Sequence, residues 1–252
     1  MRAVILAAGR GTRLHPYSES IPKSLVKVLG KPLIENTIRV LKRAGIKDII
    51  IVIGYLGDQI KRYLGDGRSL GVRITYCYNQ NYTLENAVSL KEAEGELRSE
   101  RRFLLLMGDH YFEDGIIESI LKEGGDRIFL CIDRSPRHPP QIKDATKVLV
   151  DWDNRIIDIG KDIHVWNAVD AGLFMLDNSI FGAIHTLEVE KPSVSITDCI
   201  KYLTRRVKPV YGFDISGHLW FDIDTPQDIE FINTFLGRMD AERVGRDSLT
   251  IY

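Results

Sequence analysis

The sequence of 252 residues predicts an α/β protein with a doubly wound, mostly parallel sheet that resembles the Rossmann arrangement. Three observations lead to this prediction. Unbroken apolar runs of strand length alternate with helix-period segments through the first half of the chain. The first run, Val4–Ala8, ends in a glycine-rich turn, and the second half adds an inserted hairpin. Strands that are apolar along their whole length are typical of a parallel sheet covered by helices on both faces.

The elements of the first half follow one another as strand, helix, strand. The predicted strands are Val4–Ala8, Asp48–Ile53, Val72–Tyr78 and Phe103–Met107. The predicted helices are Leu33–Arg43, Asp58–Leu64 and Leu84–Leu97. Pro32 favours the start of the first helix because its φ is fixed near the helical value. A sheet of this kind binds ligands beyond the carboxyl ends of its strands.

The second half mixes strands, helices and a hairpin. A strand at Arg127–Ile132 precedes a proline-rich loop at Pro136–Pro140. Segments 145–150 and 155–159, with a turn at Asp153–Asn154, predict the inserted β-hairpin. Further strands are expected at Ala168–Leu176, Val207–Phe213 and His218–Ile223. Helices are expected from Ser179, over Thr197–Thr204, and from Pro226 to about Gly237.

Composition excludes several classes of protein. The 34 basic and 35 acidic residues nearly cancel, so no basic excess points to nucleic acid. No apolar stretch reaches the ~18 residues that a membrane span needs, so we expect no membrane insertion. Cys77, Cys131 and Cys199 are odd in number, widely spaced and set in apolar stretches, which predicts buried thiols in a reducing, cytoplasmic setting. The oligomeric state is left open.

The turn after the first strand is the most informative local feature. Glycines at 9 and 11 permit a sharp bend and leave backbone N–H groups free to point at phosphate oxygens. Arg13 and Lys23 place two cations beside that turn. The turn lacks the third glycine of the dinucleotide fingerprint and the Gly-Lys-Ser/Thr end of the P-loop. The sequence therefore predicts a triphosphate at the carboxyl end of the first strand.

Two distant segments supply carboxylates to the same edge of the sheet. Strand Phe103–Met107 runs into Asp109, and a late strand carries Asp222 and Asp224. Two carboxylates brought together from distant positions can hold one Mg²⁺, which prefers oxygen ligands and phosphates. On the residues alone, a turn-forming role for Asp109 stays open. Asp224 has the position of an N-cap for the last helix.

The string Leu6-Ala-Ala-Gly-x-Gly-Thr-Arg-Leu, with Pro16 and then Pro22-Lys23-x-Leu25-x-x-Val28, resembles the signature of nucleotidyltransferases that activate sugar and polyol phosphates. The resemblance covers nearly the whole chain and implies one domain over 1–252. In it, 1–134 binds the nucleotide, and 135–240 binds the acceptor and supplies the second metal ligand. It also implies Asp109 and Asp222 as Mg²⁺ ligands, with the role of Asp224 open, and Arg13 and Lys23 as catalytic residues. The implied nucleotide site comprises Leu6, Ala7, Ala8, Gly9, Gly11, Thr12, Arg13, Lys23, Asn79, Glu85, Asn86, Gly108 and Asp109.

The implied reaction is attack of a phosphate monoester on the α-phosphorus of a nucleoside triphosphate, with pyrophosphate leaving. Cations are needed to bring the anions together and to stabilise the leaving group. The attacking phosphate is already ionised at neutral pH, so no general base is required. By the same resemblance, Lys161 binds the phosphate of the acceptor, and the strand that enters Gly172 lines the acceptor pocket. Lys147, on the first hairpin strand, is a second candidate for that phosphate, and Asp170 and His110 could bond acceptor hydroxyls.

Departures from the sugar-specific pattern bear on the substrate. The stretch Asn79–Leu90 lacks the usual Gly-Thr-Ala, and Gly108-Asp-His110 replaces Gly-Asp-Asn or Gly-Asp-Val. This pattern is most similar to CTP:inositol-1-phosphate cytidylyltransferases, which implies that CTP and inositol 1-phosphate give CDP-inositol and pyrophosphate. The expected partners are thus CTP and a phosphorylated polyol.

Three alternatives remain open at this stage. One is a hexose-1-phosphate enzyme that uses UTP, GTP or dTTP. Another is a phosphocholine cytidylyltransferase, in which an aromatic cage around the quaternary nitrogen could draw on Tyr82, Tyr111, Phe112 and Trp166. The third is a catalytically inactive regulatory nucleotide-binding protein, but such a relative would be expected to lose the glycine turn, the lysine or the carboxylates.

Overall fold

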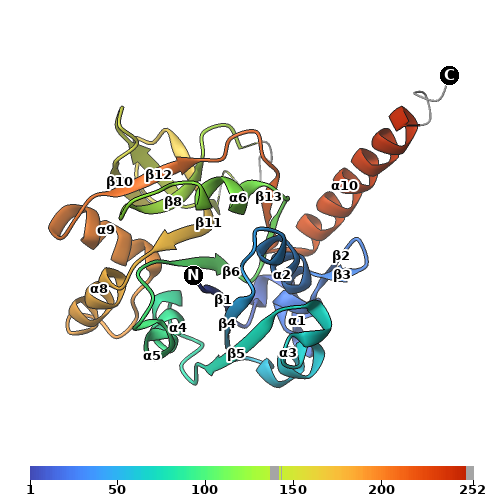
Figure 1. Cartoon of the computed structure of the whole chain (residues 1–252), viewed down its shortest axis with the longest axis horizontal. Coiled ribbons are helices and arrows are strands. Elements are labelled where there is room, and N and C mark those ends of the chain that lie inside the picture. Colours follow the sequence, from blue (N-terminus) through green and yellow to red (C-terminus); the bar gives the residue numbers. More distant parts are fainter. Residues whose placement is uncertain (137–141, 143, 248–252) are drawn as a thin grey trace.

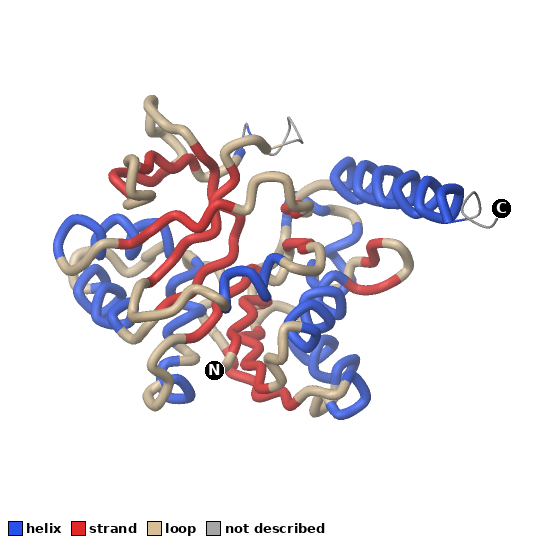
Figure 2. Tube along the Cα trace, turned by 45° about the horizontal axis from the view of Figure 1, so that its top comes forward, coloured by secondary structure: helices blue, strands red, loops and turns tan. Residues whose placement is uncertain are grey.

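The computed structural model of the chain describes residues 1–136, 142 and 144–247. The loop expected at Pro136–Pro140 lies, apart from Pro136, outside the described residues. Within the described part, nine strands form one twisted sheet with helices on both of its faces (Figures 1 and 2). This arrangement confirms the predicted α/β fold class.

The centre of the sheet is parallel. Strands β1 (Ala3–Ala7), β4 (Asp48–Ile53) and β5 (Arg73–Tyr78) lie side by side, with β6 (Phe103–Met107) on the other edge of β1. Successive residues of β1 enter opposite cores, Val4 in one and Ile5 in the other. Both faces of the strand are therefore buried, which explains why its sequence is apolar without alternation.

Helices bury the two faces of the sheet in separate cores. One face is covered by α2 (Leu33–Arg43), α3 (Gly57–Leu64) and α6 (Ile116–Leu121). The other face is covered by α4 (Asn86–Lys91), α5 (Glu94–Leu97), α8 (Ser179–Glu188) and α9 (Ile196–Arg206). The segment between β1 and α2 forms η1 (Thr12–Leu14), α1 (Tyr17–Ser20), η2 (Lys23–Leu25), β2 (Lys27–Val28) and β3 (Lys31–Pro32), and η3 (Arg68–Leu70) precedes β5.

The second half extends the sheet through β11 (Ala168–Leu176), which runs antiparallel to β6. On its far side β11 pairs with β9 (Lys147–Val150) and β8 (Ile128–Asp133), and β8 pairs with β12 (Val210–Asp214). Strand β10 (Ile156–Gly160) pairs antiparallel with β9, which confirms the inserted hairpin. Its turn places Asn154 in the left-handed region, with φ of 60°.

Several boundaries differ from the prediction. The helix expected at Leu84–Leu97 is two short helices, and the strand expected from Val207 begins at Val210 because α9 continues to Arg206. The segment expected as a strand at His218–Ile223 forms β13 (Trp220–Asp222), which pairs with β7 (His110–Phe112) apart from the main sheet. The last helix, α10 (Pro226–Asp247), is longer than predicted and projects from the body of the molecule (Figure 1).

The remaining expectations about composition can be placed on the structure. Cys131 and Cys199 are buried as predicted, whereas Cys77 is only partly buried. Among the described residues, no helix has the length and apolar character needed to cross a bilayer. The cellular location and the extent of the domain stay predictions.

Candidate functional site

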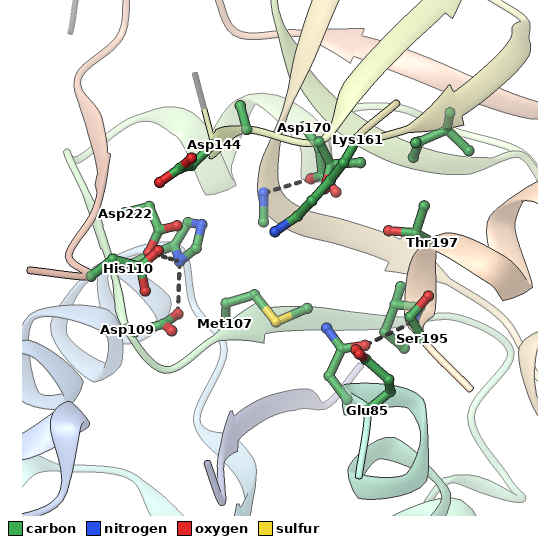
Figure 3. A pocket seen from close by; sticks show the side chains of 18 of the residues that line it. Glu85, Met107, Asp109, His110, Asp144, Lys161, Asp170, Ser195, Thr197 and Asp222 are labelled. Atoms are coloured by element: carbon green, nitrogen blue, oxygen red, sulfur yellow. Dashed lines mark hydrogen bonds and ion pairs between the residues drawn. The ribbon is translucent and has the colours of Figure 1, made fainter. Parts of the chain in front are cut away.

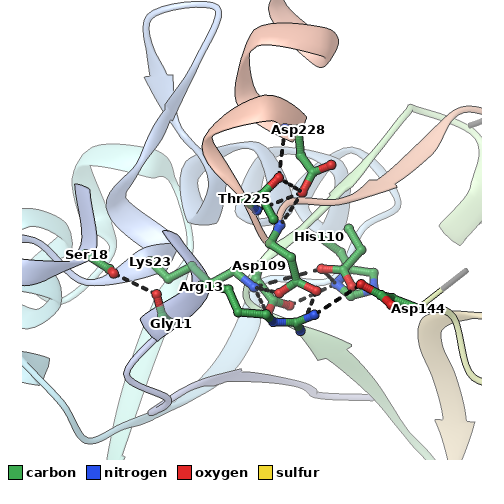
Figure 4. A network of polar contacts seen from close by, with 11 residues as sticks. Gly11, Arg13, Ser18, Lys23, Asp109, His110, Asp144, Thr225 and Asp228 are labelled. Atoms are coloured by element: carbon green, nitrogen blue, oxygen red, sulfur yellow. Dashed lines mark hydrogen bonds and ion pairs between the residues drawn. The ribbon is translucent and has the colours of Figure 1, made fainter. Parts of the chain in front are cut away.

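The glycine-rich turn after β1 packs directly against Lys23. Gly11 has φ of 60°, and a Cβ at this position would lie 2.9 Å from the Cβ of Lys23. A larger residue would therefore be strained in its backbone and would displace the lysine stem. The hydroxyl of Ser18 donates to the carbonyl of Gly11 at 2.6 Å and fixes the turn (Figure 4). The turn lines a cavity of about 470 Å³, which we call the smaller cavity.

Lys23 is the central cation of the site. Its side chain is almost fully buried, and Nζ donates to Asp109 Oδ2 at 2.7 Å and to Asp224 Oδ1 at 2.5 Å (Figure 4). Asp222 Oδ1 lies 3.9 Å from the same nitrogen. Burial alone would lower the pKa of Lys23, but the three carboxylates outweigh it and raise that pKa above its ordinary value. Lys23 is therefore charged at any pH near neutrality.

Arg13 adds a second cation at the mouth of the site. Its Nη2 lies 2.5 Å from Asp224 Oδ2, while Nη1 lies 3.7 Å from Asp144. About half of the arginine side chain is exposed, whereas Asp224 is largely buried. Asp224 thus orients both cations toward the same space.

The structure brings Asp109, His110 and Asp222 together, with potential ligand atoms within 4.8 Å of one another. Asp222 Oδ1 is buried and accepts no hydrogen bond. Burial and the nearby Asp109 carboxylate raise the pKa of Asp222 above its ordinary value, in spite of the opposing effect of His110. A buried carboxylate oxygen without a donor, next to a second carboxylate, fits a divalent cation that takes oxygen ligands.

His110 orients Asp109 and is itself held firmly. Its Nδ1 donates to Asp109 Oδ1 at 2.8 Å, and its ring is stacked with Phe112 and Trp220 at centroid distances of 5.9 and 6.1 Å. Burial would lower its pKa, but Asp222 and Asp109 raise it to about 9. The indole N–H of Trp220 donates to the buried Asp133 at 2.9 Å. His110 is thus held in a fixed position beside the two carboxylates.

A larger cavity of about 850 Å³ adjoins the smaller one, and both are lined by Arg13, Glu85, Asp109 and Asp224. The larger cavity reaches from Asp222 and His110 to Ser195 and Thr197 at the start of α9 (Figure 3). Lys161, which follows β10, extends its side chain into this space (Figure 3). Asp170 and Gly172 of β11 also line it. Burial raises the pKa of Asp170 to about 6, although the N–H of Gly172, which donates to Oδ1 at 2.7 Å, opposes the increase.

The smaller cavity is lined by most of the residues that were predicted to bind the nucleotide. These are Leu6, Ala7, Gly9, Gly11, Thr12, Arg13, Lys23, Glu85, Gly108 and Asp109. Ala8 is buried, and Asn79 is buried with its amide donating to Ser89 at 2.8 Å, so neither is among the residues that line the two cavities. Asn86 lines the larger cavity instead of the smaller one. Gly108 allows β6 to approach β1, because a Cβ there would lie 2.6 Å from the carbonyl oxygen of Leu6.

The structure differs from the predictions for Lys147 as an acceptor contact and for Asp224 as a helix cap. Lys147 does not line either cavity in the described structure, and its Nζ donates to the carbonyl of Lys161 at 2.9 Å. The prediction that Asp224 caps the last helix is wrong. Thr225 Oγ1 accepts from the N–H of Asp228 at 3.3 Å, and Asp228 Oδ2 accepts from the N–H of Thr225 at 2.7 Å. This reciprocal cap leaves the Asp224 carboxylate free to bind Lys23 and Arg13.

Sequence reasoning missed several polar residues that line the cavities: Ser24, Thr146, Asp162, Lys191, Ser193, Ser195, Thr197 and Lys201. Ser24 Oγ is buried in the lining of the smaller cavity and has no hydrogen-bond partner in the described structure. For the residues near Ser195, the sequence did contain a pattern that predicts a helix start. Ser195 and Asp198 have the spacing of a capping box, and they form one at the N-terminus of α9.

A family model described as "Nucleotidyl transferase" matches residues 2–238. The chain belongs to the nucleotidyl transferase family. It is 32% identical over 247 residues to the "Bifunctional IPC transferase and DIPP synthase" of Aquifex aeolicus, an alignment that covers 96% of this chain and 53% of the relative. The chain therefore spans about half the length of this curated relative.

Two solved structures of this nucleotidyltransferase fold are similar over most of their length. The inositol-1-phosphate CTP transferase from T. maritima is 28% identical, with a TM-score of 0.80 and coverage of 92% of this chain and 94% of that one. The CTP:phosphocholine cytidylyltransferase from Streptococcus pneumoniae is 29% identical, with a TM-score of 0.74 and coverage of 93% and 98%. The family and the fold are thus those expected from the glycine-rich turn.

Proposed function

We propose that this nucleotidyltransferase transfers the CMP group of CTP to inositol 1-phosphate, giving CDP-inositol and pyrophosphate, with Mg²⁺ as the metal. One observation carries the choice of acceptor: a large polar cavity opens from the carboxylates of Asp109 and Asp222. Its lining offers the hydroxyl of Ser195, the carboxylate of Asp170 and the ammonium group of Lys161. A polyol phosphate has the complementary groups, namely several hydroxyls and one dianion. The names of the Aquifex and T. maritima relatives agree with this choice.

The lining of the larger cavity disfavours phosphocholine as the acceptor. A quaternary ammonium group is bound by several aromatic faces. Among the described lining residues of the larger cavity, the aromatic side chains are Phe174 and Trp220. The four residues considered for a cage, Tyr82, Tyr111, Phe112 and Trp166, do not line either cavity as described. Inositol therefore fits the cavity better than choline does.

Lys23 and Arg13 would bind the nucleotide phosphates. A lysine ammonium has three N–H donors, and two of them already bind Asp109 and Asp224. The third is left for a phosphate oxygen in the adjoining smaller cavity. Arg13, anchored at Nη2 by Asp224, keeps its remaining N–H groups for the same anion. Fixed donors of this kind stabilise charge that moves to the leaving pyrophosphate without having to reorganise.

Asp109 and Asp222 would hold the Mg²⁺, with His110 orienting Asp109 through their hydrogen bond. When bound, the ion supplies positive charge that lessens the repulsion between the two phosphate esters. At the acceptor end, Lys161 would bind the attacking phosphate, and Asp170 would accept hydrogen bonds from the inositol hydroxyls. No residue is needed as a base, because the attacking phosphate carries no proton that must be removed at neutral pH.

A matrix of substrates tests this function. Four nucleoside triphosphates are each combined with inositol 1-phosphate, glucose 1-phosphate, mannose 1-phosphate and phosphocholine, and pyrophosphate release is measured. We expect the highest kcat/KM with CTP and inositol 1-phosphate. A higher value with a hexose phosphate or phosphocholine would refute the acceptor. No turnover in any combination would favour an inactive regulatory protein.

Asp109→Asn tests whether that turnover belongs to the described site. The amide keeps the size of the side chain but loses the charge that a divalent ion requires. We expect loss of Mg²⁺-dependent turnover with the fold retained. Turnover close to that of the unaltered protein would refute the assignment of Asp109 as a ligand.

A further inference from the structure

One wall of the larger cavity is the segment Ser193–Thr197, which runs from the loop before α9 into the first turn of that helix and which we call the acceptor wall. Its residues alternate between two environments. Val194 and Ile196 are buried in the core between the sheet and α8–α9. Ser193, Ser195 and Thr197 are only partly buried and line the cavity. The backbone is extended at Ser195 and becomes helical at Ile196, and across this transition every second side chain, each bearing a hydroxyl group, lines the cavity.

The acceptor wall is attached to the start of α4 by three hydrogen bonds. The N–H of Glu85 donates to Ser193 Oγ at 3.0 Å, and the N–H of Ala87 donates to the carbonyl of Val194 at 3.2 Å. In the opposite direction, the N–H of Ile196 donates to Asn86 Oδ1 at 2.8 Å. Figure 3 shows Glu85 and Ser195 facing each other across this junction.

These bonds satisfy groups that the two helices leave open. The first N–H groups of any helix have no partner inside the helix, and α4 has no side-chain cap of its own. The carbonyl oxygen of Val194, in the acceptor wall, supplies the missing hydrogen-bond partner to the N–H of Ala87. The side-chain oxygen of Asn86 in turn accepts a hydrogen bond from the N–H of Ile196, the first residue of α9. The two helix starts therefore cap each other.

We infer that Asn86 is a positioning residue for the acceptor, and that it acts by holding the Ser193–Thr197 wall in place through the N–H of Ile196. This role differs from the nucleotide contact predicted from the sequence. It rests on the proposed function, because the larger cavity is assigned there to the acceptor. Without the Asn86 oxygen, the N–H of Ile196 is left buried without a partner, and the wall must shift to hydrate it.

The first test uses two variants at one position. Asn86→Ala removes the side-chain oxygen that accepts the hydrogen bond from Ile196, whereas Asn86→Asp keeps an oxygen in the same place. We expect Asn86→Ala to raise KM for inositol 1-phosphate by about tenfold or more, the effect of one buried group left unpaired. KM for CTP should change by less than about threefold, and Asn86→Asp should bring the acceptor KM back to within about threefold of the unaltered protein.

Asn233→Ala is the matched control. Asn233 Oδ1 also accepts a backbone N–H from a distant segment, that of Leu29 at 2.7 Å, and Asn233 lines neither cavity. It should leave both KM values unchanged. If Asn86→Ala raised only the KM for CTP, Asn86 would be a nucleotide contact, as expected from the sequence. Equal changes in both KM values would indicate a general structural role, and either result would overturn the inference.

A second test needs no substrate and separates this inference from the proposed function. Amide hydrogen exchange is measured on the unliganded protein. We expect the Ile196 amide to exchange about tenfold faster or more in Asn86→Ala but not in Asn86→Asp, because exchange reports the loss of a single protecting contact. Unchanged exchange would refute the positioning role even if the acceptor proved to be a different phosphate. Should Asn86→Ala fail to fold, Ser193→Ala removes the bond from Glu85 together with one hydroxyl of the cavity lining. This variant should also raise KM for inositol 1-phosphate, and an unchanged value would count against the inference.

Discussion

Replacing Gly172 with alanine should damage both the fold and the active site. Gly172 lies in an irregular stretch of β11, between the register positions of Asp170 and Phe174, and has φ of 72°. A Cβ at this position would lie 2.5 Å from Nε2 of His110. His110 has no room to retreat, because its ring is stacked with Phe112 and Trp220.

The expected loss of stability has two sources. An L-residue in the left-handed region costs about 1–2 kcal/mol, and forcing extra atoms into a packed site costs about 1–3 kcal/mol. The free energy of unfolding should therefore fall by about 2–5 kcal/mol. Moving His110 also moves the Asp109 carboxylate that it orients, and a displacement near 1 Å can lower turnover by about a hundredfold.

Urea unfolding and pyrophosphate release measure the two effects. Gly182→Ala is the matched control, because Gly182 lies within α8 and a Cβ there would meet no heavy atom within 4 Å. The same substitution should stabilise the protein at that position by about 0.5–1 kcal/mol and leave turnover unchanged. If Gly172→Ala were as stable and as active as the unaltered protein, the argument that His110 is fixed against β11 would be wrong.

Three other substitutions test the charges of the site. Lys23→Ala should lower kcat more than about tenfold, or over ~1.4 kcal/mol of transition-state stabilisation; a change in thermal unfolding alone would mean that the lysine serves only as an ion-pair partner. Lys161→Ala should raise KM for the acceptor more than KM for CTP, and the reverse would place the acceptor elsewhere. Asp170 has its pKa raised to about 6 by burial, so it binds a proton more tightly in the folded than in the unfolded protein. It therefore makes the protein lose stability as pH rises from about 4 to about 6. Asp170→Asn should remove that loss, so urea unfolding should show a larger gain for the variant at pH 7.5 than at pH 4, and an equal gain at both would contradict the raised pKa.

The sequence was sufficient where local pattern and burial agree. The predicted helix Leu33–Arg43 and the predicted strand Phe103–Met107 match α2 and β6 residue for residue. It failed where an element is too short to have a period. Strand β7 has three residues directly after Asp109, and its partner β13 also has three. Neither shows its pairing in its own sequence, because only tertiary contact joins them.

Candidate site residues could likewise be predicted where they are close together in the sequence, but not where tertiary contacts place them. The turn near Gly11 could be predicted, because its glycines and the following cations are close in sequence. The acceptor wall could not, because the serines at 193 and 195 look like ordinary loop and capping residues. Their place in a cavity depends on Val194 and Ile196 being buried on the opposite side. Asn79 shows the opposite case, since this polar residue near the expected site is buried and donates to Ser89 of α4 instead of lining either cavity.

Asp224 shows how the two ends of the chain depend on each other. Asp222 and Asp224 are two residues apart on either side of the buried Ile223, so extended backbone directs both carboxylates to one side. Three carboxylates in so small a space repel one another, and nearby cations offset that repulsion. Lys23 and Arg13, which follow the first strand, supply the balancing charge to Asp224 at 2.5 Å each. The two cations from the first part of the chain and the carboxylate of Asp224 from the last part therefore hold one another in place through these ion pairs.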